Sequence, residues 1–248
     1  MGPIDGTSQI SILDQPPITE DYFNRSFATW NLSMMKSKPV IGIYGDSFAD
    51  PKWVSNNYDA WPELLSKDYK IKNYSLSGTS LWWSYNKFLE TCNKIDYAIF
   101  VVTVPGRIHI EHNDKHLNLN PVTWPIWDGV SIGEIYFKYF YSNKRETAFH
   151  NFMVNDLLEY DKILLIPAFT ESIPNYPMSL CYLADMETDY YGLDHSGPNE
   201  RRKCHLSKEN NKVIYNKITA ALEINSKVLT ISESDFIVPS DSLEYYWK

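Results

Sequence analysis

Three short polar segments each follow an apolar run, and each holds residue types that suit acyl-transfer chemistry. They are Gly45–Ser47, Ser77–Thr79 and Thr103–Arg107. A serine in a sharp turn between a strand and a helix presents its hydroxyl, and the free backbone N–H groups of such a turn bind an anion. The three segments therefore predict a serine nucleophile beside an anion-binding set of N–H groups.

A nucleophilic serine also needs a base within hydrogen-bond reach, and in most such sites the base is a histidine. Among six histidines, His205 stands just before the last expected helix, and His195 is the second candidate. His109, His112 and His116 are spaced three and four apart, a spacing that would gather metal ligands on a helix. No cysteine or H-E-x-x-H pattern accompanies them, so we interpret this segment as a solvated polar loop and expect neither a metal nor a cofactor.

The elements that must position these residues can be read from the hydrophobic pattern. Strands are expected at 39–44, 70–76, 98–104 and 162–168, with a short one at 228–231. Helical spacing of apolar residues predicts three helices, each with one inward face. The first face holds Leu81, Tyr85, Phe88, Leu89 and Cys92, and the second holds Phe149, Phe152, Met153, Leu157 and Tyr160. The third helix is expected to begin after an N-cap at Ser207, and its face holds Ile214, Ile218, Ala221 and Leu222. Residues 105–132 and 171–204 lack a regular period and are expected to be long loops.

Strands that alternate with helices indicate an α/β fold, a three-layer α/β/α sandwich around a mainly parallel central sheet. In such a sheet ligands bind beyond the carboxyl ends of the strands. The three polar segments stand at those ends. We expect one domain over 39–248, preceded by an N-terminal arm or lead-in at 1–38.

Three blocks of the chain, in their order and spacing, resemble the SGNH (GDSL-type) hydrolase family. They are Ile41–Ser47, Asn73–Ser80 and His205–Asn210, and the resemblance covers roughly residues 39–225. It implies an SGNH-hydrolase or flavodoxin-like sandwich with Ser47 as nucleophile and His205 as general base. It also implies that the backbone N–H groups of Ser47 and Gly78 form two parts of an oxyanion hole.

The chain departs from the family pattern in two places. The family's third block supplies an asparagine side chain to the oxyanion hole, but the matching segment here reads Thr-Val-Pro-Gly-Arg, so Thr103 or Arg107 would have to donate instead. The family's acid stands three residues before the histidine, where this chain has Arg202. Glu200 is our candidate for the orienting acid, and Asp194 is the alternative.

Composition limits the substrate and the partners. Aromatic residues make up 15% of the chain, and tyrosine and tryptophan can stack on sugars as well as fill a core. The candidate substrate-binding residues are Asp46, Trp82, Trp83, Trp124 and Trp127.

A net charge of −8 argues against a nucleic-acid partner. No apolar stretch approaches the ~18 residues of a membrane span, and the N-terminus lacks the pattern of a signal peptide. Three cysteines without a C-x-x-C pair favour a cytoplasmic location.

The leading hypothesis is therefore a serine esterase that removes an acyl group, with acetyl esters of carbohydrates as a candidate substrate class. The alternative from another class is a non-catalytic SGNH-like module that binds a glycan or takes part in an assembly. A flavodoxin-like nucleotide binder is the third hypothesis, and the missing glycine-rich and acidic signatures disfavour it. The oligomeric state stays open.

Overall fold

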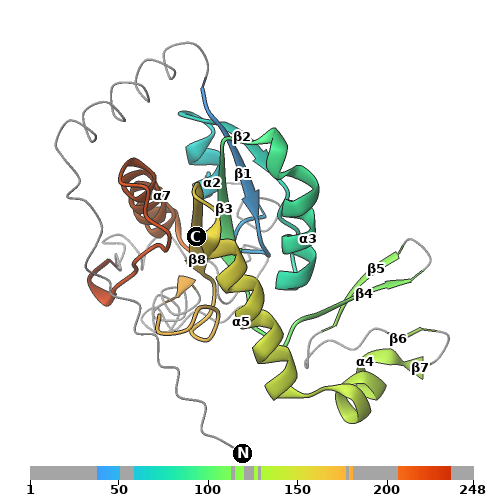
Figure 1. Ribbon diagram of the computed structural model, residues 1–248. Helices are drawn as coiled ribbons and strands as arrows, with labels where there is room; N and C mark the ends of the chain where they lie inside the picture. Colours follow the sequence, from blue (N-terminus) through green and yellow to red (C-terminus); the bar gives the residue numbers. More distant parts are fainter. Residues whose placement is uncertain are drawn as a thin grey trace, which may run out of the picture. The chain divides into compact units, whose positions relative to one another are not determined.

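A computed structural model describes residues 38–50, 59–112, 115–119, 126–127, 130–176, 179–180 and 206–235. Its centre is a four-stranded parallel sheet in the order β2-β1-β3-β8 (Figure 1). The strands are β1 (Val40–Tyr44), β2 (Lys70–Asn73), β3 (Tyr97–Val102) and β8 (Ile163–Pro167). The four main expected strands are confirmed, each somewhat shorter than the range expected from the sequence.

Helices cover both faces of this sheet (Figure 1). Helices α2 (Trp61–Leu65) and α7 (Lys208–Glu223) contact each other on one face, and α3 (Leu81–Thr91) and α5 (Asn143–Glu159) contact each other on the other. Side chains alternate between two cores because successive residues of a strand point to opposite faces. The first core holds Ile41, Ile43, Ile99 and Val101 with Trp61 and Leu65; the second holds Tyr44, Ala98, Phe100 and Val102 with Phe88 and Met153. The expected α/β fold with its layered architecture is therefore present.

Serine side chains cap the helices that begin near the carboxyl ends of the strands. Ser207 caps α7 by accepting a hydrogen bond from Asn210 N at 3.2 Å, which confirms the expected N-cap. Ser80 caps α3 in the same way through Trp83 N. These bonds satisfy one of the N–H groups that the first turn of a helix leaves without a partner.

The expected helical faces are only partly right. On α7 all four predicted residues are buried. On α3 Leu89 is exposed, whereas Ser84 and Thr91 face the sheet; Thr91 Oγ1 lies 2.8 Å from the Tyr44 hydroxyl. On α5 the predicted Phe149 and Phe152 are exposed, and the buried residues are His150, Met153, Val154 and Leu157. Counting apolar residues alone misplaced these faces, because small polar side chains and a hydrogen-bonded histidine fill the inner positions.

The segment 105–132 is not simply a long loop, and that expectation was wrong. It contains an antiparallel pair, β4 (Ile108–His112) with β5 (Lys115–Leu119), and a shorter pair, β6 (Ile126–Trp127) with β7 (Val130–Ser131). The apolar–polar alternation that begins at Ile108 is the pattern in the sequence that indicates β4. The three spaced histidines therefore stand on strands, and His109 pairs with Asn118. No group of side chains that could hold a metal is found within the described ranges.

Other elements complete the described chain. They are the 3₁₀-helices η2 (Cys92–Lys94) and η4 (Glu233–Asp235), helix α4 (Ile132–Ile135) and the π-helix η3 (Tyr136–Phe140). The strand expected at 228–231 is reduced to a parallel bridge between Val228 and Leu165. The expected lead-in, except Lys38, and most of the expected loop at 171–204 lie outside the described residues. None of the described helices is long and apolar enough to cross a membrane.

Candidate active site

The two central strands of the sheet, β1 and β3, end at the point where the strand order reverses. From β1 the chain goes to β2 on one side, and it then returns past β1 to β3 on the other. In open parallel sheets the carboxyl edge at this reversal is the usual position of a ligand site. Gly45–Ser47 follows β1 and Thr103–Arg107 follows β3, so two of the three polar segments meet there.

The turn that carries Ser47 depends on a glycine. Gly45 has a φ of 150°, and a Cβ atom there would lie 2.6 Å from the Cβ atom of Val101. Asp46 closes the turn, because its carbonyl accepts hydrogen bonds from the amides of Ala49 and Asp50 at 3.0 and 3.1 Å. The result is a tight turn in which Ser47 is only half-buried.

Hydrogen bonds tie the turn after β2 to the turn after β1. The Gly45 carbonyl accepts from Leu76 N at 3.0 Å and from Thr79 Oγ1 at 3.1 Å. Asp50 Oδ2 accepts from Ser77 N at 3.2 Å. Gly78 itself has a φ of 77°, a left-handed conformation that favours glycine, and no atom lies within 4 Å of the position its Cβ would take. Gly78 therefore borders open space beside the Gly45 turn.

The backbone amides of Ser47 and Gly78 have no hydrogen-bond acceptor within the described residues, and neither has the Ser47 hydroxyl. Both residues are half-buried, so these amides can donate to water or to the oxygen atom of an incoming ligand. Two donors of this kind are what an oxyanion hole requires. The roles of Ser47 as nucleophile and of Gly78 in an oxyanion hole stay predictions.

Arg107 and Asp46 form an ion pair beneath this turn. Arg107 Nη1 lies 2.6 Å from Asp46 Oδ2; the Asp46 side chain is fully buried and that of Arg107 is 16% exposed. The guanidinium carbon lies 4.9 Å from the centre of the Phe169 ring. The sequence predicted Arg107 as a candidate oxyanion donor and Asp46 as a candidate substrate contact, and it did not predict their contact with each other. Both charged residues follow expected strands, but the sequence does not show that these two strands are neighbours.

Thr103, the other candidate donor, is 2% exposed, and its Oγ1 is buried with no hydrogen-bond partner among the described residues. A buried hydroxyl without a partner costs free energy. Thr103 thus keeps an unused donor at the carboxyl end of β3, next to the turn that carries Arg107.

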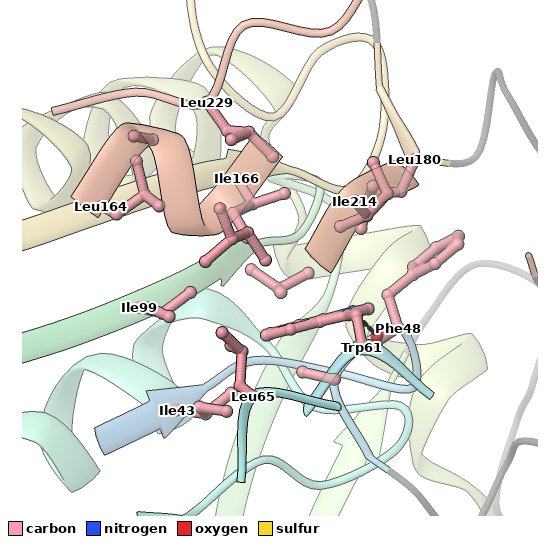
Figure 2. Close-up of a cluster of buried hydrophobic side chains, with 14 of the residues drawn as sticks. Ile43, Phe48, Trp61, Leu65, Ile99, Leu164, Ile166, Leu180, Ile214 and Leu229 are labelled. Carbon is pink, nitrogen blue, oxygen red and sulfur yellow. Dashed lines mark hydrogen bonds between the residues drawn. The ribbon is translucent and has the colours of Figure 1, made fainter. Parts of the chain in front are cut away.

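His205, His195, Glu200 and Asp194 lie outside the described residues. The residue after His205 is described: Leu206 is buried in the same cluster as Phe48, the residue after Ser47. Two side chains link these neighbours. Trp61 Nε1 donates to the Phe48 carbonyl at 2.8 Å, and Figure 2 shows this bond as a dashed line. Asn211 Oδ1 accepts from Trp61 N at 3.0 Å, and Asn211 Nδ2 donates to the Leu206 carbonyl at 3.1 Å.

This linkage matters because it fixes the start of α7 against the turn of the proposed nucleophile. Asn211 is only 3% exposed, so its amide is reserved for these backbone partners. Neither Trp61 nor Asn211 was predicted from the sequence. Nothing in the sequence marks a buried asparagine in a helix as a link to a residue 150 positions away.

A cavity of about 230 Å³ lies between α3, β4 and α5. Its lining includes Trp82, which is 40% exposed at the start of α3, but not the half-buried Trp83. Of the other two candidate tryptophans, Trp124 lies outside the described residues and Trp127 stands at the end of β6. Arg107 also lines this cavity, so one side chain borders the cavity and contacts the Ser47 turn.

His150 is a buried histidine of α5 in the wall of the same cavity. Its Nε2 lies 2.7 Å from the Ser172 carbonyl, which can only accept, so Nε2 carries the proton. Burial lowers the pKa of His150 below its ordinary 6.5, and the ring is therefore neutral at pH 7.

Comparison of the chain with models of known protein families and with curated proteins finds no match.

Proposed function

We propose that this chain is a serine esterase of the SGNH (GDSL-type) kind, which removes an acyl group through an acyl-enzyme intermediate. The observation that carries the proposal is the linkage of the Gly45–Ser47 and Leu76–Thr79 turns by hydrogen bonds, with the amides of Ser47 and Gly78 left without partners among the described residues. A half-buried serine beside two unused N–H donors supports nucleophilic attack on a carbonyl carbon. The resemblance of the three sequence blocks supports the same chemistry.

In the proposed reaction, Ser47 Oγ attacks the acyl carbonyl and its proton passes to His205. The carbonyl oxygen becomes an oxyanion that accepts hydrogen bonds from the amides of Ser47 and Gly78. Collapse of this intermediate breaks the ester bond, and the leaving alcohol takes the proton from His205. Water, deprotonated by His205, then attacks the acyl-enzyme and releases the carboxylic acid and free Ser47.

The proposal is tested by turnover of p-nitrophenyl acetate. We expect Ser47→Ala and His205→Ala each to lower turnover at least ~10³-fold, and the double variant to lose little more, because residues of one catalytic unit are not additive. Ser84→Ala, at a buried serine of α3, is the matched control. Full activity of Ser47→Ala would remove Ser47 from the mechanism.

The orienting acid is tested in the same assay. Glu200→Gln should lower turnover by ~10²–10⁴-fold if its carboxylate holds His205 in the tautomer that accepts the serine proton. Loss of activity in Asp194→Asn instead would assign the role to Asp194. Full activity in both variants would indicate a Ser47–His205 pair without a carboxylate.

The second candidate is a glycan-binding module without catalysis. One observation favours it: the described cavity is lined by aromatic and polar side chains but not by Ser47, and Arg107 donates to Asp46. A ligand in this cavity needs no serine chemistry. The module hypothesis predicts glycan binding by the wild-type chain with no turnover of p-nitrophenyl acetate and no reaction with a fluorophosphonate.

A further inference from the structure

Two aromatic side chains form one side of the cavity between α3 and α5. The rings of Trp82 and Phe149 have centroids 5.3 Å apart and are inclined at 41°. Both are substantially exposed, at 40% and 44%. Exposed rings beside a cavity offer an apolar face to a ligand, since burying them against that ligand removes apolar surface from water.

The polar atoms of the cavity wall have unused hydrogen-bonding capacity. Glu146 Oε1 accepts all the described bonds of this carboxylate, from the Tyr136 hydroxyl and from two guanidinium nitrogens of Arg145. Oε2 accepts none from the described residues, and the Glu146 side chain is 14% exposed. It therefore remains accessible as an acceptor in the wall of the cavity.

His150 adds a second acceptor. With Nε2 donating to the Ser172 carbonyl, Nδ1 of the neutral ring carries a lone pair, and no described residue donates to it. The guanidinium of Arg107 also lines the cavity and supplies donors. The wall thus combines an aromatic surface with both donors and acceptors.

Size and polarity together select the ligand class. A volume of about 230 Å³ falls below the ~300–1,000 Å³ of sites for drug-sized ligands, so the cavity holds a ligand of about one ring. A purely aliphatic chain would leave Glu146 Oε2 and His150 Nδ1 without partners, which is unfavourable. A sugar ring has an apolar face for the aromatic pair and hydroxyl groups for the polar atoms.

We propose that this cavity binds one sugar ring through the face of Trp82 and Phe149, with Glu146 and His150 accepting hydrogen bonds from its hydroxyls. Because Arg107 also contacts Asp46 next to Ser47, the ring is the part of the substrate next to the scissile ester. The placement of the ring next to the ester rests on the proposed function, whereas the binding of the sugar in the cavity does not.

The experiment measures sugar binding in the absence of catalysis. The full-length Ser47→Ala variant is titrated with methyl glycosides of glucose, galactose, mannose, xylose and N-acetylglucosamine and followed by saturation-transfer NMR. Phe149→Ala is added as the test variant and Phe152→Ala as its matched control: both phenylalanines are exposed on α5, and only Phe149 lines the cavity. Hexanol serves as the aliphatic probe.

We expect at least one glycoside to bind, with affinity lowered about tenfold or more by Phe149→Ala and by less than about twofold by Phe152→Ala. Glu146→Gln should also weaken binding of that glycoside. Absence of glycoside binding, equal effects of the two phenylalanine variants, or binding of hexanol alone would overturn the proposal. Glycoside binding without p-nitrophenyl acetate turnover by the wild-type chain would refute only the esterase. Turnover of p-nitrophenyl acetate without glycoside binding would refute only the sugar site.

Discussion

Arg107 Nη1 lies 2.6 Å from Asp46 Oδ2, and this ion pair joins the turn after β3 to the turn that carries Ser47. Asp46 Oδ1 accepts in addition from Phe48 N at 3.2 Å, so both oxygens of the buried carboxylate are occupied. The ion pair fixes the backbone on both sides of Ser47. The position of the proposed nucleophile therefore depends on a charge contact with a different strand.

Removing the guanidinium should destabilise the protein strongly. Arg107→Leu leaves the Asp46 carboxylate buried without its counter-charge, a change that typically costs about 3–5 kcal/mol. The free energy of unfolding in urea measures the effect. Lys87→Ala, which breaks the exposed Lys87–Glu90 pair, is the control and should change the same quantity by less than about 1 kcal/mol. Similar small effects of both substitutions would contradict a structural role for the Arg107–Asp46 pair.

Gly45 and Gly78 should respond differently to alanine. Gly45→Ala places a Cβ 2.6 Å from Val101 Cβ and 2.9 Å from the Val101 carbonyl oxygen, so a strand or the turn must move. Gly78→Ala meets no atom and carries only the conformational penalty of its positive φ, about 1–2 kcal/mol. Thermal unfolding of the two variants tests this order. A lower melting temperature for Gly78→Ala than for Gly45→Ala would contradict the described geometry of the Gly45 turn.

Asn211 is predicted to be a positioning residue. Asn211→Ala removes the link from Trp61 N to the Leu206 and Ser207 carbonyls, which loosens the segment that follows His205. We expect lower kcat for p-nitrophenyl acetate with little change in KM, together with a loss of about 1–3 kcal/mol in stability. The control is Asn86→Ala, an asparagine on the exposed side of α3 whose amide donates to the Trp82 carbonyl. Equal kcat in the Asn211 variant and the wild type would show that this linkage does not position the base.

His150 makes stability depend on pH in a definite direction. Burial lowers its folded-state pKa below the ordinary 6.5, so the unfolded chain binds the proton more tightly. The contribution of His150 is therefore fully present above pH about 6.5 and is lost as pH falls from there through the folded-state pKa. The free energy of unfolding in urea, measured between pH 8 and 5, should depend less steeply on pH in His150→Gln than in the wild type. The side-chain amide of the glutamine can still donate to the Ser172 carbonyl. The same slope in both proteins would be the contrary result.

The sequence predicted the parallel strands because long β-branched runs such as 98–104 have few other interpretations. It also placed Ser47 and Gly78 in turns, since glycine beside polar residues at the end of an apolar run favours a turn. The pair of Arg107 with Asp46 depends on which strands are neighbours, and local patterns do not encode strand order. The inward side of α5 escaped prediction for a related reason: His150 is buried by a bond to Ser172, 22 residues away.

The nucleophile assignment is tested most directly by locating a fluorophosphonate adduct in the intact chain. The Ser47 oxygen should displace fluoride from phosphorus, and peptide mass mapping should place one adduct per chain on Ser47. The His205→Ala variant should react far more slowly, because the serine proton then has no acceptor. An unlabelled wild-type chain, or an adduct on another residue with Ser47 unmodified, would contradict the assignment of Ser47 as the nucleophile.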